Sequence, residues 1–305
     1  MYYGGKMQFE HLMLFSKIAS EKSISKVAVE NHISQSALSQ QMKRLEDEIG
    51  FTLFERSNRG IDLTPAGELI SKYALQFIVI YKNMRDDLDN LKSNFGTVRI
   101  FATNVAAEYA LPCSLFKVKI HFPHYSFSLT ASRSANVIQQ VLNGSADIGF
   151  IVGKASDPEL ICTEAFSDKI YLVTNKNTKA GNDITMDQLY QYPLIMLDKA
   201  SSSHKLIKEY IVGQGGVMDK LKIMCYLEST ESVKSAVINQ NGLAFLPYLA
   251  IKKELYHKQL RIINLQNFDL NCDIYSIHRS KKEINNPELY SVIEYFITTV
   301  NKSIC

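Results

Sequence analysis

Hydrophobic residues in the first part of the chain recur at the spacing of α-helices. Apolar side chains three and four positions apart predict a first helix over residues 9–19. A short second helix is predicted over residues 26–30, with Ser25 as its N-cap. A turn at residues 31–33 then leads into another stretch with helical spacing.

This third predicted helix has two different faces. Ser34 is a good N-cap, no Pro or Gly interrupts residues 35–49, and Gly50 stands where a left-handed residue ends a helix. The apolar face consists of Ala37, Leu38, Met42, Leu45 and Ile49. The polar face consists of Ser36, Ser39, Gln40 and Lys43. From this helix alone, an ordinary solvated surface is as good an interpretation as contact with phosphates and base edges in a major groove.

The residues around this helix favour the nucleic-acid interpretation. A short helix, a tight turn and a helix with small polar side chains at its N-terminal end predict a helix-turn-helix. Residues 51–56 are predicted to form a strand, residues 57–60 a turn and residues 61–64 a returning strand, which is the wing of a winged helix-turn-helix. Arg56 and Arg59 lie on this wing, where they can reach phosphates or a narrow minor groove.

A long helix is predicted after the wing. Thr64 is expected to be its N-cap, with Pro65 at its first position. Apolar residues continue at helical spacing for nearly thirty residues: Leu69, Ile70, Tyr73, Phe77, Ile80, Tyr81, Met84, Leu88 and Leu91. This length favours a dimer seam, and the alternative is a helix that packs on its own chain.

From Gly96 onward, strands and helices are predicted to alternate, which is typical of a parallel α/β sheet with right-handed crossovers. The first group of elements is predicted at residues 98–102, 106–118, 125–130, 135–142 and 147–152. A second group is predicted at residues 169–174, 185–189, 194–197, 204–212, 222–227, 232–239 and 243–247. Strands near residues 261–265 and 273–277, and a closing helix to about residue 300, are expected to return to the first lobe.

Composition adds little to this picture. The 305 residues are enough for two or three domains, and 46% hydrophobic and 21% charged residues are ordinary for a globular protein. The net charge is +3, and residues 1–60 hold eight basic and seven acidic side chains. Bulk charge therefore does not indicate nucleic-acid binding, and the prediction depends on where the charges lie.

Neither a disulfide framework, a metal site nor a membrane segment is expected. The cysteines are scattered and odd in number, which favours reduced thiols in a cytoplasmic protein: Cys113, Cys162, Cys225, Cys272 and Cys305. His121 and His124 have no cysteine nearby, so we expect no metal, and no cofactor motif occurs. No apolar run approaches the roughly 20 residues needed to span a bilayer, and no signal peptide is recognisable.

The N-terminal part of the sequence resembles the LysR-type transcriptional regulators. The matching positions are Phe15, Ser23, Ser25, Ala28, Ser34, Gln35, Ala37, Leu38, Ser39, Gln41, Leu45, Glu46, Gly50, Leu53, Phe54, Arg56, Arg59, Leu63, Thr64, Ala66 and Gly67. Ser36 stands where the family often has Pro and Gln40 where it often has Arg, so the operator sequence is not implied. Val27 and Asn31 also depart from the usual Ala and Leu.

The C-terminal part resembles the effector domain of the same family, a two-lobed fold like that of periplasmic binding proteins. The matching segments are residues 109–112, 144–149 and 242–247. The resemblance implies an α/β fold class with an N-terminal winged helix-turn-helix and a two-lobed effector domain. The implied boundaries are 1–64 for the DNA-binding domain, 65–94 for the linker helix and 95–305 for the effector domain, with lobe I at 95–168 and 269–305 and lobe II at 169–268.

The resemblance also implies partners. The linker helix is expected to form a homodimer. Two dimers are expected to pair into a tetramer, and the sequence leaves dimer and tetramer open. Double-stranded operator DNA and a small-molecule effector are the expected ligands, with RNA polymerase as a further partner if the protein activates transcription. The expected DNA-contacting residues are Ser34, Gln35, Ser36, Ser39, Gln40, Lys43, Arg56 and Arg59.

Hydroxyl and amide side chains are expected to line the effector cleft. A ligand in an open parallel sheet lies beyond the carboxyl ends of the strands, and helix N-termini bind anions well, so we expect an anionic effector. The candidate residues are Thr103, Asn104, Ser132, Ser134, Ser201, Ser202, Ser203, Ser229 and Thr230. The alternative for each one is plain helix capping.

Two other functions compete with that of a ligand-responsive regulator. A hydrolytic enzyme is disfavoured because no nucleophile elbow, phosphate-binding loop, dinucleotide motif or zinc-protease motif occurs, so no catalytic residue is assigned. A transcription factor that senses redox state through Cys113, Cys162 or Cys225 remains the alternative, although no resolving cysteine is apparent from spacing.

Overall fold

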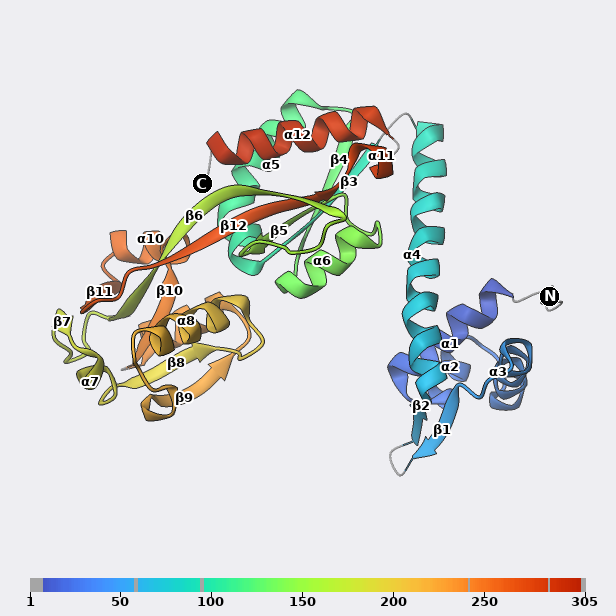
Figure 1. Cartoon of the computed structure of the whole chain (residues 1–305), viewed down its shortest axis with the longest axis horizontal. Coiled ribbons are helices and arrows are strands. Elements are labelled where there is room, and N and C mark those ends of the chain that lie inside the picture. Colours follow the sequence, from blue (N-terminus) through green and yellow to red (C-terminus); the bar gives the residue numbers. More distant parts are fainter. Residues whose placement is uncertain (1–7, 58–59, 94–95, 241, 285, 303–305) are drawn as a thin grey trace. The chain divides into compact units, whose positions relative to one another are not determined.

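The chain forms two compact units that divide after Leu88. The computed structural model describes residues 8–57, 60–93, 96–240, 242–284 and 286–302 (Figure 1).

Three helices make up the core of the N-terminal unit: α1 (Phe9–Glu21), α2 (Ile24–Glu30) and α3 (Gln35–Ile49). The expected N-cap of the second helix was wrong, because α2 begins earlier and the Ser23 hydroxyl accepts the capping hydrogen bond from the Lys26 amide at 3.3 Å. Ser23 and Ser25 are both suitable N-cap residues by type, so the sequence alone does not show which of them begins the helix. The expected caps of α3 are confirmed: Ser34 accepts from the Ala37 amide, and Gly50 is left-handed with φ +79°.

A single apolar cluster joins the three helices. Its buried members are Leu12, Phe15, Ile18, Val27, Ala28, Leu38, Met42, Leu45, Leu53 and Ala74. Leu38, Met42 and Leu45 are the buried positions of α3, so this helix buries its predicted apolar face and leaves the opposite one in solvent.

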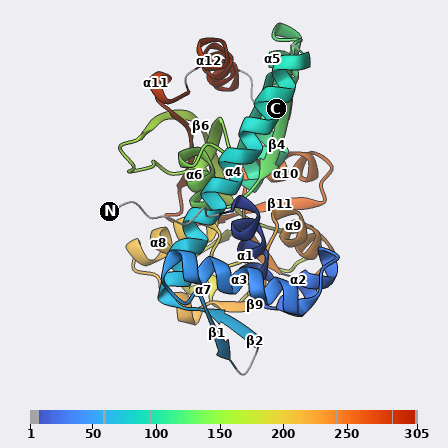
Figure 2. The ribbon, with the colours of Figure 1, turned by 90° about the vertical axis from the view of Figure 1, so that its right-hand side faces the viewer.

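The wing is a two-stranded hairpin of β1 (Phe54–Ser57) and β2 (Gly60–Leu63), which extends beyond the three helices (Figure 2). The first strand starts three residues later than expected. Glu46 of α3 explains this, because its carboxylate accepts hydrogen bonds from the Leu53 and Phe54 amides at 2.7 and 3.2 Å. The segment before Phe54 is therefore tied to α3 and not to the hairpin.

The long helix α4 (Pro65–Ser93) follows the wing. As expected, Thr64 caps it: its hydroxyl accepts from the Gly67 amide at 3.0 Å. A Cβ at Gly67 would lie 2.1 Å from the Leu53 carbonyl oxygen, so this position requires glycine. Large apolar side chains along α4 remain exposed, and those that form one continuous stripe are Leu69, Tyr73, Phe77, Ile80, Tyr81, Met84 and Leu88.

The C-terminal unit is built on one twisted sheet with the strand order β4-β3-β5-β12-β6-β10-β8-β9. The strands at one end define lobe I: β3 (Gly96–Ala102), β4 (Tyr125–Ala131) and β5 (Ile148–Val152). The strands at the other end define lobe II: β8 (Pro193–Leu197), β9 (Lys222–Leu227) and β10 (Leu243–Pro247). Neighbours within each lobe are parallel, as the alternation of strands and helices predicted.

Two long strands cross between the lobes. They are β6 (Leu160–Asn175) and β12 (Leu270–Arg279), which pair antiparallel with each other along their length. Their register shifts between Ile274 and Tyr275. β6 begins nine residues before the predicted strand. Two short strands, β7 (Asp183–Ile184) and β11 (Leu260–Leu265), complete the outer edge of lobe II.

Helices cover both faces of the sheet (Figure 1). In lobe I, α5 (Leu111–His121) and α12 (Pro287–Lys302) cover one face and α6 (Ser134–Leu142) the other. A π-helical turn, Ala106–Ala110, precedes α5, so the expected continuous helix is divided before Pro112. The remaining helical segments are α7 (Met186–Leu189), α8 (Ser202–Gly213), Met218–Lys220, α9 (Thr230–Asn239), α10 (Tyr248–Tyr256) and α11 (Lys281–Ile284). Within the described residues, no helix is both long and apolar enough to cross a membrane.

Candidate nucleic-acid interface and effector cleft

The polar face of α3 is open to solvent. All six of the expected contact residues on this helix and its cap are exposed: Ser34, Gln35, Ser36, Ser39, Gln40 and Lys43. The acidic residues of the helix, which would repel phosphates, lie in its last turn from Glu46 onward. Arg44 is also exposed, one turn after Gln40, and the i, i+4 spacing was the signal that could have included it.

Hydrogen bonds fix the N-terminal end of this face. The Ser34 hydroxyl accepts from the Ala37 amide at 3.1 Å and lies 3.0 Å from the Ser36 hydroxyl. The Ser25 hydroxyl of α2 donates to the side-chain carbonyl oxygen of Gln35 at 3.1 Å. The helix-turn-helix therefore holds Gln35 in place while the residue stays exposed.

The two wing arginines are described only in part. Arg56 lies in β1, with its backbone opposite Ile61 of β2, and its side chain lies outside the described residues. Arg59 lies outside them altogether.

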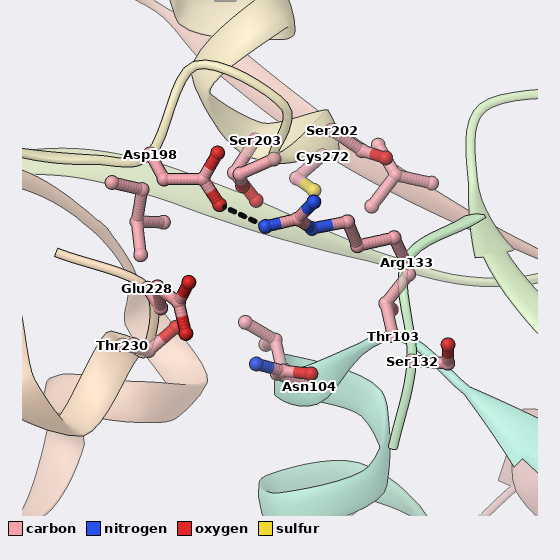
Figure 3. Close-up of a pocket in the computed structure, with 14 residues that line it drawn as sticks. Thr103, Asn104, Ser132, Arg133, Asp198, Ser202, Ser203, Glu228, Thr230 and Cys272 are labelled. Carbon is pink, nitrogen blue, oxygen red and sulfur yellow. Dashed lines mark hydrogen bonds and ion pairs between the residues drawn. The ribbon is translucent and has the colours of Figure 1, made fainter. Parts of the chain in front are cut away.

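A cavity of about 70 Å³ lies between lobe I and lobe II, beyond the ends of several strands (Figure 3). Thr103 and Asn104 follow β3, Ser132 follows β4, and Asp198 follows β8. This is the location that strand order predicts for a ligand in an open α/β sheet.

Most of the expected effector residues line this cavity. The seven that do are Thr103, Asn104, Ser132, Ser201, Ser202, Ser203 and Thr230. Ser134 does not line it; its hydroxyl accepts hydrogen bonds from the Val152 amide and from the Ser202 hydroxyl. Ser229 caps α9 by accepting from the Ser232 amide, so the capping alternative holds for this residue.

Charged residues that were not among the candidates also line the cavity. Arg133 of lobe I and Asp198 of lobe II form an ion pair of 2.7 Å across it, and Glu228 lies beside Thr230 (Figure 3). Asp198 directly follows the predicted strand 194–197, so the rule of strand ends could have found it. Arg133 stands between two expected serines.

One lining side chain has an unused hydrogen-bonding group. The Thr103 side chain is only 7% exposed, and its hydroxyl has no partner in the described structure. A buried hydroxyl without a partner is unfavourable, so this group is available to a bound molecule. Ser201 adds a second unused hydroxyl, because as the N-cap of α8 it makes no side-chain capping hydrogen bond.

A second polar contact joins the two lobes away from the cavity. The Tyr109 hydroxyl donates to Glu231 of α9, which also pairs with Lys234 at 2.6 Å. Lys234 is buried and pairs with Glu254 at 2.9 Å. Burial and the neighbouring Glu231 carboxylate raise the pKa of Tyr109, so its hydroxyl remains a donor at neutral pH.

The cysteines differ in accessibility. Cys225 is exposed, Cys162 is partly buried and Cys272 is buried, and these three thiols are free. Burial raises the pKa of Cys272, which lines the cavity, to about 12, so it stays an unreactive thiol. Cys113 is disulfide-bonded, so the expectation of reduced thiols was wrong for this residue. In the described part of the chain, no cluster of His, Cys, Asp and Glu could hold a metal ion.

A winged helix-turn-helix with an exposed polar helix face, followed by a two-lobed α/β domain with a cleft, defines a DNA-binding transcriptional regulator. Two family models match the chain. The helix-turn-helix of bacterial regulatory proteins of the lysR family matches residues 9–68, and the LysR substrate binding domain matches residues 92–299. The chain therefore belongs to the LysR family of transcriptional regulators.

The chain is also similar to individual transcriptional regulators. The chain is 26% identical to the HTH-type transcriptional regulator CysL of Bacillus subtilis, over 93% of this chain and 95% of CysL. It is 31% identical to a probable RuBisCO transcriptional regulator of Porphyra purpurea, over 81% of this chain and 80% of that protein. The fold is similar to that of full-length CbnR in complex with its target DNA, with a TM-score of 0.72, 18% identity, and coverage of 97% and 99%.

Proposed function

We propose that the protein regulates transcription as a homodimer that binds operator DNA through α3 and the wing, and that a small molecule in the cleft controls this binding. The exposed polar face of α3, free of acidic side chains over its first three turns, is the observation that carries the proposal. DNA-bound CbnR, which shares this fold, supports it.

The side chains of α3 divide into two roles. Gln35, Ser36 and Gln40 are proposed to contact base edges, since an amide side chain can pair with adenine. Ser34 and Ser39 are proposed to contact phosphates. The basic residues Lys43, Arg56 and Arg59 are proposed to supply the salt-dependent part of the affinity.

The exposed stripe on α4 supports the dimer. A continuous row of large apolar side chains in water is unfavourable and is typical of an interface. A two-fold pair of α4 helices would present two recognition helices to half-sites on one face of the duplex. Pairs of dimers would form the expected tetramer, and RNA polymerase would be a further partner of an activator.

The cleft supports the effector. Its walls belong to two lobes that are connected by the crossing strands β6 and β12, so a ligand that contacts both walls can favour one closure angle. We propose that this angle is relayed through the dimer to the DNA-binding units. We propose no catalytic role, and we place the protein in the cytoplasm because that is where a bacterial regulator meets its operator.

Selection of sites from random duplexes, followed by footprinting with the full-length protein, tests DNA binding. We expect a two-fold related site whose protection disappears in a Gln35→Ala, Gln40→Ala double variant. Gln259→Ala, an exposed glutamine of the C-terminal unit, is the matched control. Failure to enrich any sequence would contradict the proposal, as would an unchanged site in the double variant.

A further inference from the structure

The cleft combines one positive and two negative side chains. Arg133 comes from lobe I, whereas Asp198 and Glu228 come from lobe II (Figure 3). The single guanidinium is already paired with Asp198. A ligand that is only an anion would meet two carboxylates in this cavity, and a ligand that is only a cation would meet the guanidinium.

The Arg133–Asp198 pair can be exchanged. The Arg133 side chain is 55% exposed and that of Asp198 is 22% exposed, and ion pairs in such an environment contribute little net free energy. A ligand carboxylate that replaced Asp198 would leave Asp198 with the Ala200 amide but without a positively charged partner. A ligand ammonium that replaced Arg133 would leave Arg133 without its carboxylate partner. A molecule with both groups leaves neither charge unpaired.

Neutral polar side chains in the cavity also favour a ligand with a carboxylate. The buried Thr103 hydroxyl has no partner, and Asn104 beside it lines the cavity from the same lobe as Arg133. At the N-terminus of α8, the hydroxyl of Ser201 is also unused. These neutral groups of both lobes add hydrogen-bonding partners for a carboxylate, while Asp198 and Glu228 provide acceptors for an ammonium.

The size of the cavity limits the ligand. Its volume is about 70 Å³. This space is large enough for the carboxylate and the ammonium of a small molecule, and it is open to solvent on one side.

We propose that the effector is a small zwitterion with a carboxylate and an ammonium group, of the class of short-chain α-amino acids, and that it binds by replacing the Arg133–Asp198 ion pair with one ion pair to each residue. This inference rests on the proposed function of the cleft and specifies its ligand. It differs from the sequence-based expectation of an anionic effector by adding a positively charged group to the ligand.

Three probes of nearly equal shape test the charge requirement on the full-length protein. L-alanine carries both charges, L-lactate replaces the ammonium with a hydroxyl, and L-alaninamide replaces the carboxylate with an amide. Glycine, L-serine and their hydroxy-acid and amide counterparts extend the series. We expect at least one of the amino acids to bind, measured by calorimetry and thermal melting, at least tenfold more tightly than both of its counterparts. Equal or tighter binding of the counterparts, or no binding of any amino acid in the series, overturns the proposal.

Variants assign the two charges. Asp198→Asn should weaken binding of the amino acid at least tenfold without weakening binding of the hydroxy acid. Arg133→Gln should weaken binding of the amino acid at least tenfold without weakening binding of the amide. Glu209→Gln and Lys205→Gln, exposed on α8, are the matched controls. A uniform loss of affinity for all probes would indicate a structural effect and would overturn the assignment of the charges.

The failure of this inference differs from the failure of the proposed function. If lactate binds best and changes the affinity for operator DNA, the cleft is an effector site and the ligand class is wrong. If an amino acid binds as described but leaves DNA affinity, footprint and bend unchanged, the ligand class is correct and the effector function is wrong.

Discussion

Ser25 of α2 holds the side-chain carbonyl oxygen of Gln35, the first residue of α3, through a hydrogen bond of 3.1 Å. Gln35→Ala should relax specificity at one base pair of each half-site by about 1–3 kcal/mol, because a paired amide is lost there. Ser25→Ala should relax specificity at the same position by a smaller amount, since the amide is then free to turn. Competition binding with duplexes substituted at single positions measures both effects. If Ser25→Ala changes specificity at a different base pair, the hydrogen bond from Ser25 does not orient the Gln35 amide toward its base.

The basic residues should act on affinity and not on sequence preference. Lys43→Gln and Arg56→Ala should each weaken binding to all duplexes and lower the slope of log K against log salt by about one unit. Fluorescence anisotropy over a range of salt concentrations measures the slope. Lys205→Gln, on α8 of the other unit, should leave it unchanged. An unaltered slope for Arg56→Ala would show that the wing does not lie on the DNA.

The α4 stripe should control dimerisation. Ile80 is 58% exposed in the single chain. Ile80→Glu should raise the dimer dissociation constant at least about a hundredfold, because both chains carry the change and burying each Ile side chain is worth about 1.5–3 kcal/mol. Sedimentation equilibrium measures the constant, and Lys82→Glu, on the opposite side of the helix, is the control. Equal dissociation constants for both variants would place the interface elsewhere.

The Tyr109–Glu231 contact should stabilise the C-terminal unit. Tyr109→Phe removes the only donor hydroxyl of this side chain while Glu231 keeps Lys234 as a partner. We expect a loss of about 1–2 kcal/mol in the free energy of unfolding, measured with urea. Tyr256→Phe is the control, since this side chain is 83% exposed. Equal stability of the two variants would mean that the contact contributes nothing.

Cys272 should make stability depend on pH in alkaline solution. Burial raises its pKa from 9.0 to about 12, so the folded state keeps a proton that the unfolded chain releases. The contribution is fully present below pH 9 and is lost as the pH rises toward 12, at about 1.4 kcal/mol per pH unit. Urea unfolding of the wild type should therefore show a steeper decline above pH 9 than that of Cys272→Ala. Cys225→Ala, at an exposed thiol, should decline as the wild type does.

Local patterns predicted the local structure well. The two faces of α3, its cap at Ser34 and its end at Gly50 follow from residues close in sequence, and the structure confirms them. The first half of β6 was missed because residues 160–168 mix apolar and charged side chains, and their pairing with β12 is over one hundred residues away in the chain. No helix was predicted for α10, because Pro247 ends the predicted strand 243–247; in the structure Pro247 is also the N-cap of α10.

Only part of the cleft lining could be predicted from the sequence. Hydroxyl and amide residues at strand ends and helix starts were predicted, and seven of them line the cavity. The Arg133–Asp198 pair was not, because its two residues lie in different lobes, 65 positions apart in the chain, and no spacing rule brings them together. Whether the lining residues bind an effector remains a prediction.

The strand order has a consequence for how the protein is made. β12 lies between β5 and β6, and α12 packs against α5, so the last segments of the chain complete the lobe that the chain began first. During synthesis, lobe II can form its sheet before the end of translation, whereas lobe I stays open until β12 has left the ribosome. A nascent chain released before β12 would therefore expose the apolar edge of β5 and would be prone to aggregation and proteolysis.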